Sequence, residues 1–182
     1  HCVTGVQTCA LPISLTDENR LLTLNLSSLD ALDDGAICPF NEIINGGYHC
    51  GSILAMDVGT QKPLIATAGT DGTVRIWNYL TQQMEVTSHN LDTTGEDITA
   101  LALHPDGFHL LLGYKDCIKY FNILMDKKTK DNEDKALYPC GEKIVKHCKK
   151  LRFSSSGHIF AAGLGLHVTI FNTNTFSVLA SF

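Results

Sequence analysis

I-A-T-A-G-T-D-G-T-V-R-I-W-N, residues 65–78, is the stretch of sequence that decides the fold. An apolar run that ends in glycine precedes the turn dipeptide Asp71-Gly72, and a second run ends in Trp77-Asn78. Asp-Gly between two such runs is typical of a tight β-hairpin turn. The stretch therefore predicts two antiparallel strands.

The same pattern recurs twice further along the chain. Each third strand ends in an aromatic residue followed by Asn, which makes Trp77, Phe121 and Phe171 equivalent, and a fourth, outer strand follows. First strands are predicted at 53–58, 98–103 and 148–153, second at 64–69, 108–113 and 158–163, third at 73–78, 117–122 and 167–172, and fourth at 84–89, around 136–145 and at 177–182. Four short antiparallel strands that recur at this period are typical of β-propeller blades.

This repeat pattern predicts an all-β chain of about three blades and part of a preceding one. We expect blades at 49–97, 98–147 and 148–182, the second with a charged insertion at 126–135, and a remnant of an earlier blade at 15–48 with strands at 19–26 and 36–44. Residues 1–14 read as the translation of a sequencing adapter and are expected to be an artefact. Because a closed propeller needs more blades, we expect a fragment whose partners include the remaining blades.

The composition excludes several classes of protein. The 182 residues carry a net charge of −5, and 44% of them are hydrophobic. No apolar run is long enough for a membrane-spanning helix, no signal peptide is apparent, and the charge is unsuited to phosphate neutralisation. We therefore expect a cytoplasmic protein that binds neither membrane nor nucleic acid.

No motif indicates catalysis, so we expect no enzyme activity, cofactor or small-molecule substrate. Gly163-Leu164-Gly165 lacks the context of a dinucleotide fingerprint, and 154–157 and 104–107 (His-Pro-Asp-Gly) are better interpreted as hairpin turns. We also expect no metal site, because the pairs His49-Cys50 and His147-Cys148 would point to opposite faces of a strand. The five cysteines outside 1–14 are expected to be reduced and mostly buried: Cys38, Cys50, Cys117, Cys140 and Cys148.

Residues 65–78 resemble the core of a WD40 repeat. The resemblance implies a buried hydrogen-bond chain that runs from a His before the first strand, through a Thr and the turn Asp, to the Trp indole: here His49, Thr67, Asp71 and Trp77. Phe121 and Phe171 offer no N–H donor, so we expect this chain in the first blade alone. Its implied role is structural.

A closer resemblance covers most of residues 50–182. The segments G-S-I-L-A-M-D-V, K-P-L-I-A-T, A-L-H-P-D-G, F-N-I-L-M-D and G-H-I-F-A-A resemble the cilia- and flagella-associated WD-repeat family of the fifty-seven type. The resemblance implies a non-catalytic scaffold of the motile axoneme that helps to position inner dynein arms and regulatory complexes on doublet microtubules. The alternative is a general WD40 adaptor that recruits protein partners to a non-ciliary complex.

Charge is distributed unevenly along the chain. Residues 15–100 carry 12 acidic and 3 basic side chains, whereas 136–182 carry 1 acidic and 5 basic. The basic ones are a candidate contact for acidic tubulin or an acidic coiled coil, and the alternative is a solvated strand edge that discourages aggregation: Lys143, Lys146, Lys149, Lys150 and Arg152.

Overall fold

The computed structural model describes residues 13–17, 20–24, 40–42, 47–89, 97–124 and 137–182. The chain forms two compact units, residues 1–48 and residues 49–182. In the described ranges the regular secondary structure consists entirely of β-strands. The predicted all-β class is therefore confirmed.

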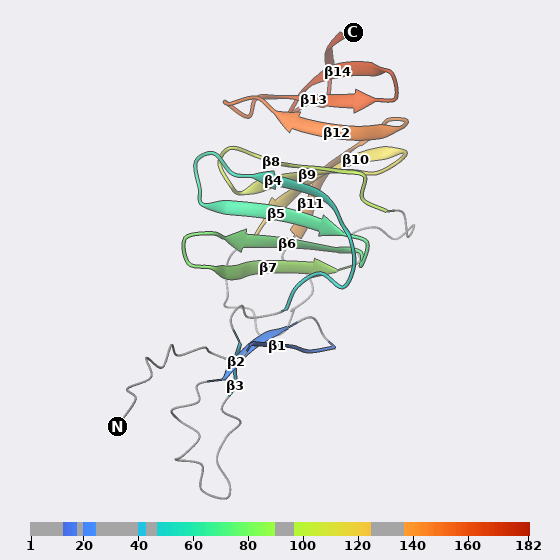
Figure 1. Cartoon of the computed structure of the whole chain (residues 1–182). Helices are drawn as coiled ribbons and strands as arrows, with labels where there is room; N and C mark the ends of the chain where they lie inside the picture. Colours follow the sequence, from blue (N-terminus) through green and yellow to red (C-terminus); the bar gives the residue numbers. More distant parts are fainter. Residues whose placement is uncertain (1–12, 18–19, 25–39, 43–46, 90–96, 125–136) are drawn as a thin grey trace, which may run out of the picture. The chain divides into compact units, whose positions relative to one another are not determined.

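The second unit consists of three four-stranded antiparallel sheets, each a meander in chain order (Figure 1). Blade 1 contains β4 (Ile53–Val58), β5 (Leu64–Gly69), β6 (Thr73–Asn78) and β7 (Gln83–His89). Blade 2 contains β8 (Ala100–Leu103), β9 (His109–Gly113), β10 (Cys117–Ile123) and β11 (Leu137–Ile144). Blade 3 contains β12 (Cys148–Phe153), β13 (Ile159–Leu164), β14 (His167–Asn172) and β15 (Val178–Ser181). The first strands, β4, β8 and β12, lie next to one another, as expected for the inner strands of a propeller.

The three blades share a bulge that confirms the repeat register. In each blade the pairing of the third strand with the fourth shifts immediately before the aromatic position, so that one residue of the outer strand is left without a partner in the ladder. The aromatic residues at this position are Trp77, Phe121 and Phe171. Their equivalence, predicted from the sequence, therefore extends to backbone pairing.

The core lies between neighbouring blades, and blade 2 is buried on both faces. Leu101 and Leu103 of β8 belong to the cluster shared with blade 1, whereas Ala100 and Ala102 belong to the cluster shared with blade 3. A strand buried on both faces reads as a continuous apolar run. This explains why 100–103 and 110–112 show no polar alternation.

The position of the aromatic residues follows from the same arrangement. Phe121 is buried in the cluster shared with blade 1, and Phe171 is buried in the cluster shared with blade 2. Trp77 lies on the opposite face of β6 from Ile76, which packs toward blade 2, and it is only partly buried. The three residues are thus equivalent in register but differ in burial.

The first unit contains a three-stranded antiparallel sheet of β1 (Ile13–Leu15), β2 (Leu21–Leu24) and β3 (Phe40–Glu42). β2 and β3 fall within the strands expected at 19–26 and 36–44. Ile13 and Ser14, assigned above to the adapter-derived segment, lie in β1. Residues 1–12 and the insertion at 126–135 lie outside the described residues, so the adapter origin, the blade remnant and the blade boundaries stay predictions.

Candidate functional site

The four residues of the expected hydrogen-bond chain come together in blade 1. The Trp77 Nε1–H donates to Thr67 Oγ1 at 2.8 Å, and His49 Nε2 lies 2.8 Å from the same oxygen. His49 Nδ1 lies 3.1 Å from both carboxylate oxygens of Asp71. The hydrogen bonds therefore connect the residues in the order Trp77, Thr67, His49 and Asp71. This order differs from the expected one, in which Asp lay next to Trp, because β6 pairs with β5 and brings the indole to Thr67.

Proton positions in this chain follow from the donor inventory. A carboxylate only accepts, so Nδ1 of His49 carries the hydrogen that Asp71 accepts. In the neutral ring Nε2 is then an acceptor for the Thr67 hydroxyl, which is in turn the acceptor for the indole N–H. Each member of the chain thus donates to the next, from the indole to the carboxylate.

Asp71 anchors this chain at the turn between β5 and β6. Burial raises the pKa of the Asp71 carboxyl, but hydrogen bonds from the Thr73 hydroxyl, the Cys50 N–H, the His49 ring and the Thr73 N–H outweigh it and hold the pKa well below its usual value. The Thr73 hydroxyl donates to Asp71 at 2.7 Å and also lies 3.0 Å from His49 Nδ1. Thr73 is thus a fifth member that the sequence analysis did not single out. The signal was present as Asp-Gly-Thr, since Asp often accepts from the N–H two residues later.

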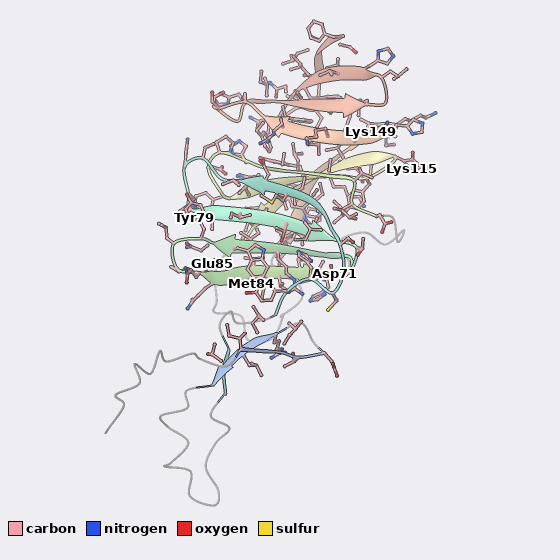
Figure 2. All side chains as sticks on the ribbon, in the orientation of Figure 1. Asp71, Tyr79, Met84, Glu85, Lys115 and Lys149 are labelled. Carbon is pink, nitrogen blue, oxygen red and sulfur yellow. The ribbon has the colours of Figure 1, made fainter. Side chains whose placement is uncertain are left out.

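The basic residues predicted as a partner contact lie on the last strand of blade 2, on the first strand of blade 3 and on the connection between these strands. Lys143 is near the end of β11, Lys146 follows it, and Lys149 and Lys150 are on β12. The carbonyl of Lys115 accepts from the His147 N–H at 2.7 Å, which brings a further lysine to this end of blades 2 and 3 (Lys115 and Lys149 in Figure 2). We call Lys115, Lys143, Lys146, Lys149 and Lys150 the basic surface.

Arg152, the fifth predicted contact residue, is engaged within the chain. Its Nη1 donates to Asp57 Oδ1 at 2.6 Å, and Asp57 Oδ2 accepts from the Leu103 N–H at 3.0 Å. Asp57 on β4 thereby joins blade 1 to both other blades. Arg152 also lines, with Lys149 and Lys150, a cavity of about 170 Å³ between β4, β8 and β12.

The expectation that the cysteines are mostly buried is wrong for the described residues. Cys148 is buried and Cys117 partly buried, but Cys50 and Cys140 are exposed, and Cys38 lies outside the described residues. Cys50 sits in the segment before β4 and Cys140 at the bulge of an outer strand, where neither is covered by a neighbouring blade. Burial raises the pKa of the Cys148 thiol to about 11, while a hydrogen bond from the Lys150 backbone lowers it slightly.

The repeated blades and the Trp-Thr-His-Asp chain define the class of WD40 repeat proteins. Residues 46–78, which include β4, β5 and β6, match the family model described as "WD domain, G-beta repeat". The predicted resemblance to WD40 repeats is therefore confirmed.

Within that class, the chain is similar to cilia- and flagella-associated protein 57. It is 32% identical to the protein of that name from Mus musculus over 163 residues, which cover 90% of this chain and 12% of the relative. It is 37% identical to cilia- and flagella-associated protein 57 A of Tetrahymena thermophila (63% of this chain, 8% of the relative) and 33% identical to protein 57 C of that species (66% and 9%). The chain thus spans about a tenth of the length of these relatives, and the closer resemblance predicted above is confirmed. Among the described residues, no helix is long and apolar enough to cross a membrane.

Proposed function

We propose that the chain is part of a non-catalytic scaffold of the motile cilium or flagellum, where it helps to position inner dynein arms and regulatory complexes on doublet microtubules. The observation that carries this proposal is the 32% identity to a cilia- and flagella-associated protein over 90% of the chain. The blade architecture supports it, since propellers present rigid loop faces on which binding surfaces are built.

The basic surface is the proposed contact for an acidic partner, with an acidic segment of tubulin or of a coiled coil as the candidates. Its lysines extend over two blades, and the connection that carries Lys146 is held by backbone hydrogen bonds from Val145 to Asp116 and from His147 to Lys115. Glu142 and Asp116 are the acidic residues adjacent to it in sequence. The five lysines exceed these two acidic residues in number, and a net positive surface favours encounter with a negatively charged partner.

Localisation tests the proposal in two steps. The full-length protein, tagged in ciliated cells of its source organism, is expected in the axoneme, and proximity labelling from the tag is expected to mark inner dynein arm or regulatory components. Labelling of a non-ciliary complex, without axonemal signal, would instead support the general adaptor.

The charge of the basic surface is tested separately. We expect Lys143, Lys146, Lys149 and Lys150 changed together to Glu to lose the proximity labels while the blades stay folded. The matched control changes the same four to Arg, which keeps the charge and should keep the labels. Equal labelling by both variants would favour the alternative, a solvated edge.

A further inference from the structure

Two imidazoles converge on one carboxylate at the turn between β8 and β9. His104 Nδ1 lies 2.9 Å from Asp106 Oδ1, and His109 Nδ1 lies 2.8 Å from Asp106 Oδ2. One ligand atom from each residue can be chosen so that all three lie within 4.8 Å of one another, and the side chains are 16 to 33% exposed. Among the described residues, this is the cluster of metal-ligand side chains that the structure brings together.

The backbone of this turn does not require these side chains. In blade 3 the equivalent turn has Ser154, Ser156 and Ile159 at the same positions. It makes the same hydrogen bonds, since Gly107 N donates to His104 O at 2.9 Å and Gly157 N to Ser154 O at 3.0 Å, and the closing bonds of both hairpins are 2.9 Å long. The imidazoles are therefore additional groups placed over an ordinary turn.

Both ring nitrogens of His104 lie close to an oxygen acceptor. Its Nε2 lies 3.3 Å from the carbonyl of Gly157, which only accepts, so Nε2 carries a hydrogen. The Asp106 N–H approaches Nδ1 at 3.3 Å, as a donor approaches a lone pair. Nδ1 also lies 2.9 Å from Asp106 Oδ1, a separation that either a proton or a metal ion on Nδ1 accounts for.

We propose that His104 Nδ1, Asp106 and His109 Nδ1 bind one zinc ion. Two imidazoles and a carboxylate form a ligand set that suits zinc, with water completing the shell on the exposed side. Ligand atoms about 2 Å from one tetrahedral ion lie about 3.3 Å apart, so binding requires the nitrogens, now 2.9 and 2.8 Å from the carboxylate oxygens, to move by a few tenths of an ångström. The Gly157 carbonyl holds the other nitrogen of His104, as outer-shell partners of metal-bound imidazoles do. Because Gly157 belongs to blade 3, the bound ion would also hold blade 2 against blade 3.

Titration of the 182-residue chain with Zn²⁺, followed by calorimetry, tests this site. We expect one ion per chain at this site, and we expect His109→Gln and Asp106→Asn each to weaken affinity at least about 10-fold. Asp106→Asn keeps an oxygen for the Phe108 N–H, which donates to Asp106 at 2.7 Å, so the turn is retained. The matched control is His158→Gln, because His158 is an exposed histidine of the equivalent turn in blade 3.

The exposed thiols of Cys50 and Cys140 are competing metal ligands. The visible absorption spectrum with Co²⁺ in place of Zn²⁺ therefore identifies the ligand atoms. A nitrogen and oxygen site gives visible ligand-field bands without intense thiolate charge transfer, and these bands should be lost in His109→Gln. Circular dichroism in EDTA checks that each variant is folded. The proposal is overturned if the wild type binds no zinc, if both variants bind like the wild type, or if the Co²⁺ spectrum is that of thiolates alone.

Discussion

The Thr67 hydroxyl connects the Trp77 indole to the His49 ring in blade 1. It lies 2.8 Å from both nitrogen atoms, on the partly buried face of the sheet that carries Trp77. Phe121 and Phe171 occupy the same register position but have no N–H to donate, and each is instead buried in an apolar cluster with a neighbouring blade. Blade 1 therefore relies on hydrogen bonds where the other blades rely on apolar packing.

Trp77→Phe tests the contribution of the indole N–H. The change keeps an aromatic ring but removes the donor to Thr67, and we expect the free energy of unfolding to fall by about 1 kcal/mol in urea titrations. Thr67→Val should cost about 1 to 3 kcal/mol, because it leaves the indole N–H without this acceptor. The loss of stability in the double variant should be smaller than the sum of the two single losses. A strictly additive loss would contradict the hydrogen bond between Trp77 and Thr67. Tyr79→Phe, at an exposed position next to β6, is the control and should change little.

Asp71 predicts an acid-sensitive blade. Its pKa is lowered in the folded state from an ordinary value near 3.8, so the folded state favours the ionised form. The resulting stability is fully present above about pH 4 and is lost as the pH falls below the unfolded pKa toward the lower folded value. Asp71→Asn should lower stability at pH 7 and reduce the loss of stability between pH 4 and pH 2. Asp116→Asn, at an exposed turn, is the control, and the same acid response in both variants would refute the prediction.

The resemblance to WD40 repeats implied the four members of the hydrogen-bond chain, whose positions are set by strands and turns of fixed length. It did not predict their order or the part of Thr73, since these depend on which side chains face each other across β5 and β6. It did not predict the contact between Arg152 and Asp57 either, because the two residues are 95 positions apart in sequence. His109 was likewise missed, as its place opposite Asp106 depends on where β9 begins.

At the scale of elements, the hairpin turns join neighbouring blades. Gly107 and Gly157 both have positive φ, of 72° and 77°, at the turns between the first and second strands of blades 2 and 3. A side chain from the preceding blade covers each of them, Lys62 over Gly107 and His104 over Gly157. Lys62 also lies 2.9 Å from the centre of the Phe108 ring, a cation–π contact between blades 1 and 2.

Alanine substitutions at three glycines distinguish the cost of backbone strain from the cost of a clash between blades. At Gly72, with φ of 70°, an added Cβ would meet nothing within 4 Å, so Gly72→Ala should cost only the strain, about 1 to 2 kcal/mol. At Gly157 the Cβ would overlap the His104 ring, and at Gly107 it would meet the aliphatic stem of Lys62, with Cδ at 2.7 Å and Cβ at 3.1 Å. Thermal melts should rank the losses Gly157→Ala, Gly107→Ala, Gly72→Ala from largest to smallest. Equal losses would show that the interblade contacts are unimportant.

Strand positions were predictable because the turn residues recur in each blade. The predicted first, second and third strands of blade 1 coincide with β4, β5 and β6, and those at 148–153 and 167–172 coincide with β12 and β14. The other predicted strands of the three blades differ by one or two residues at one or both ends. The largest difference at an inner strand is β8, which begins at Ala100 rather than Ile98. Thr99, just before this strand, connects two blades, since its N–H donates to the Gly113 carbonyl at 2.8 Å and its hydroxyl to the Cys148 carbonyl of blade 3 at 2.7 Å. That contact between blades could not be inferred from a local pattern.

At the scale of the unit formed by residues 49–182, three blades meet at their inner strands. Blade 2 is covered on both faces, whereas β4 of blade 1 leaves Ile53, Leu54 and Met56 exposed. The Asp57 carboxylate lies among these exposed residues but is itself only 8% exposed. Among the described residues, the Asp57 side chain hydrogen-bonds to both other blades, to the Leu103 N–H and to Arg152.

Variants of Asp57 and Arg152 separate the two contacts of this junction. Arg152 is 68% exposed, so its ion pair with Asp57 is well hydrated on the arginine side. Arg152→Ala should therefore cost at most about 1 kcal/mol. Asp57→Ala also deprives the buried Leu103 N–H of its acceptor and should cost about 1 to 3 kcal/mol. Asp57→Asn keeps an acceptor for that N–H and should fall near Arg152→Ala in urea unfolding. If Arg152→Ala were the more damaging change, the ion pair rather than the backbone contact would hold the three blades together.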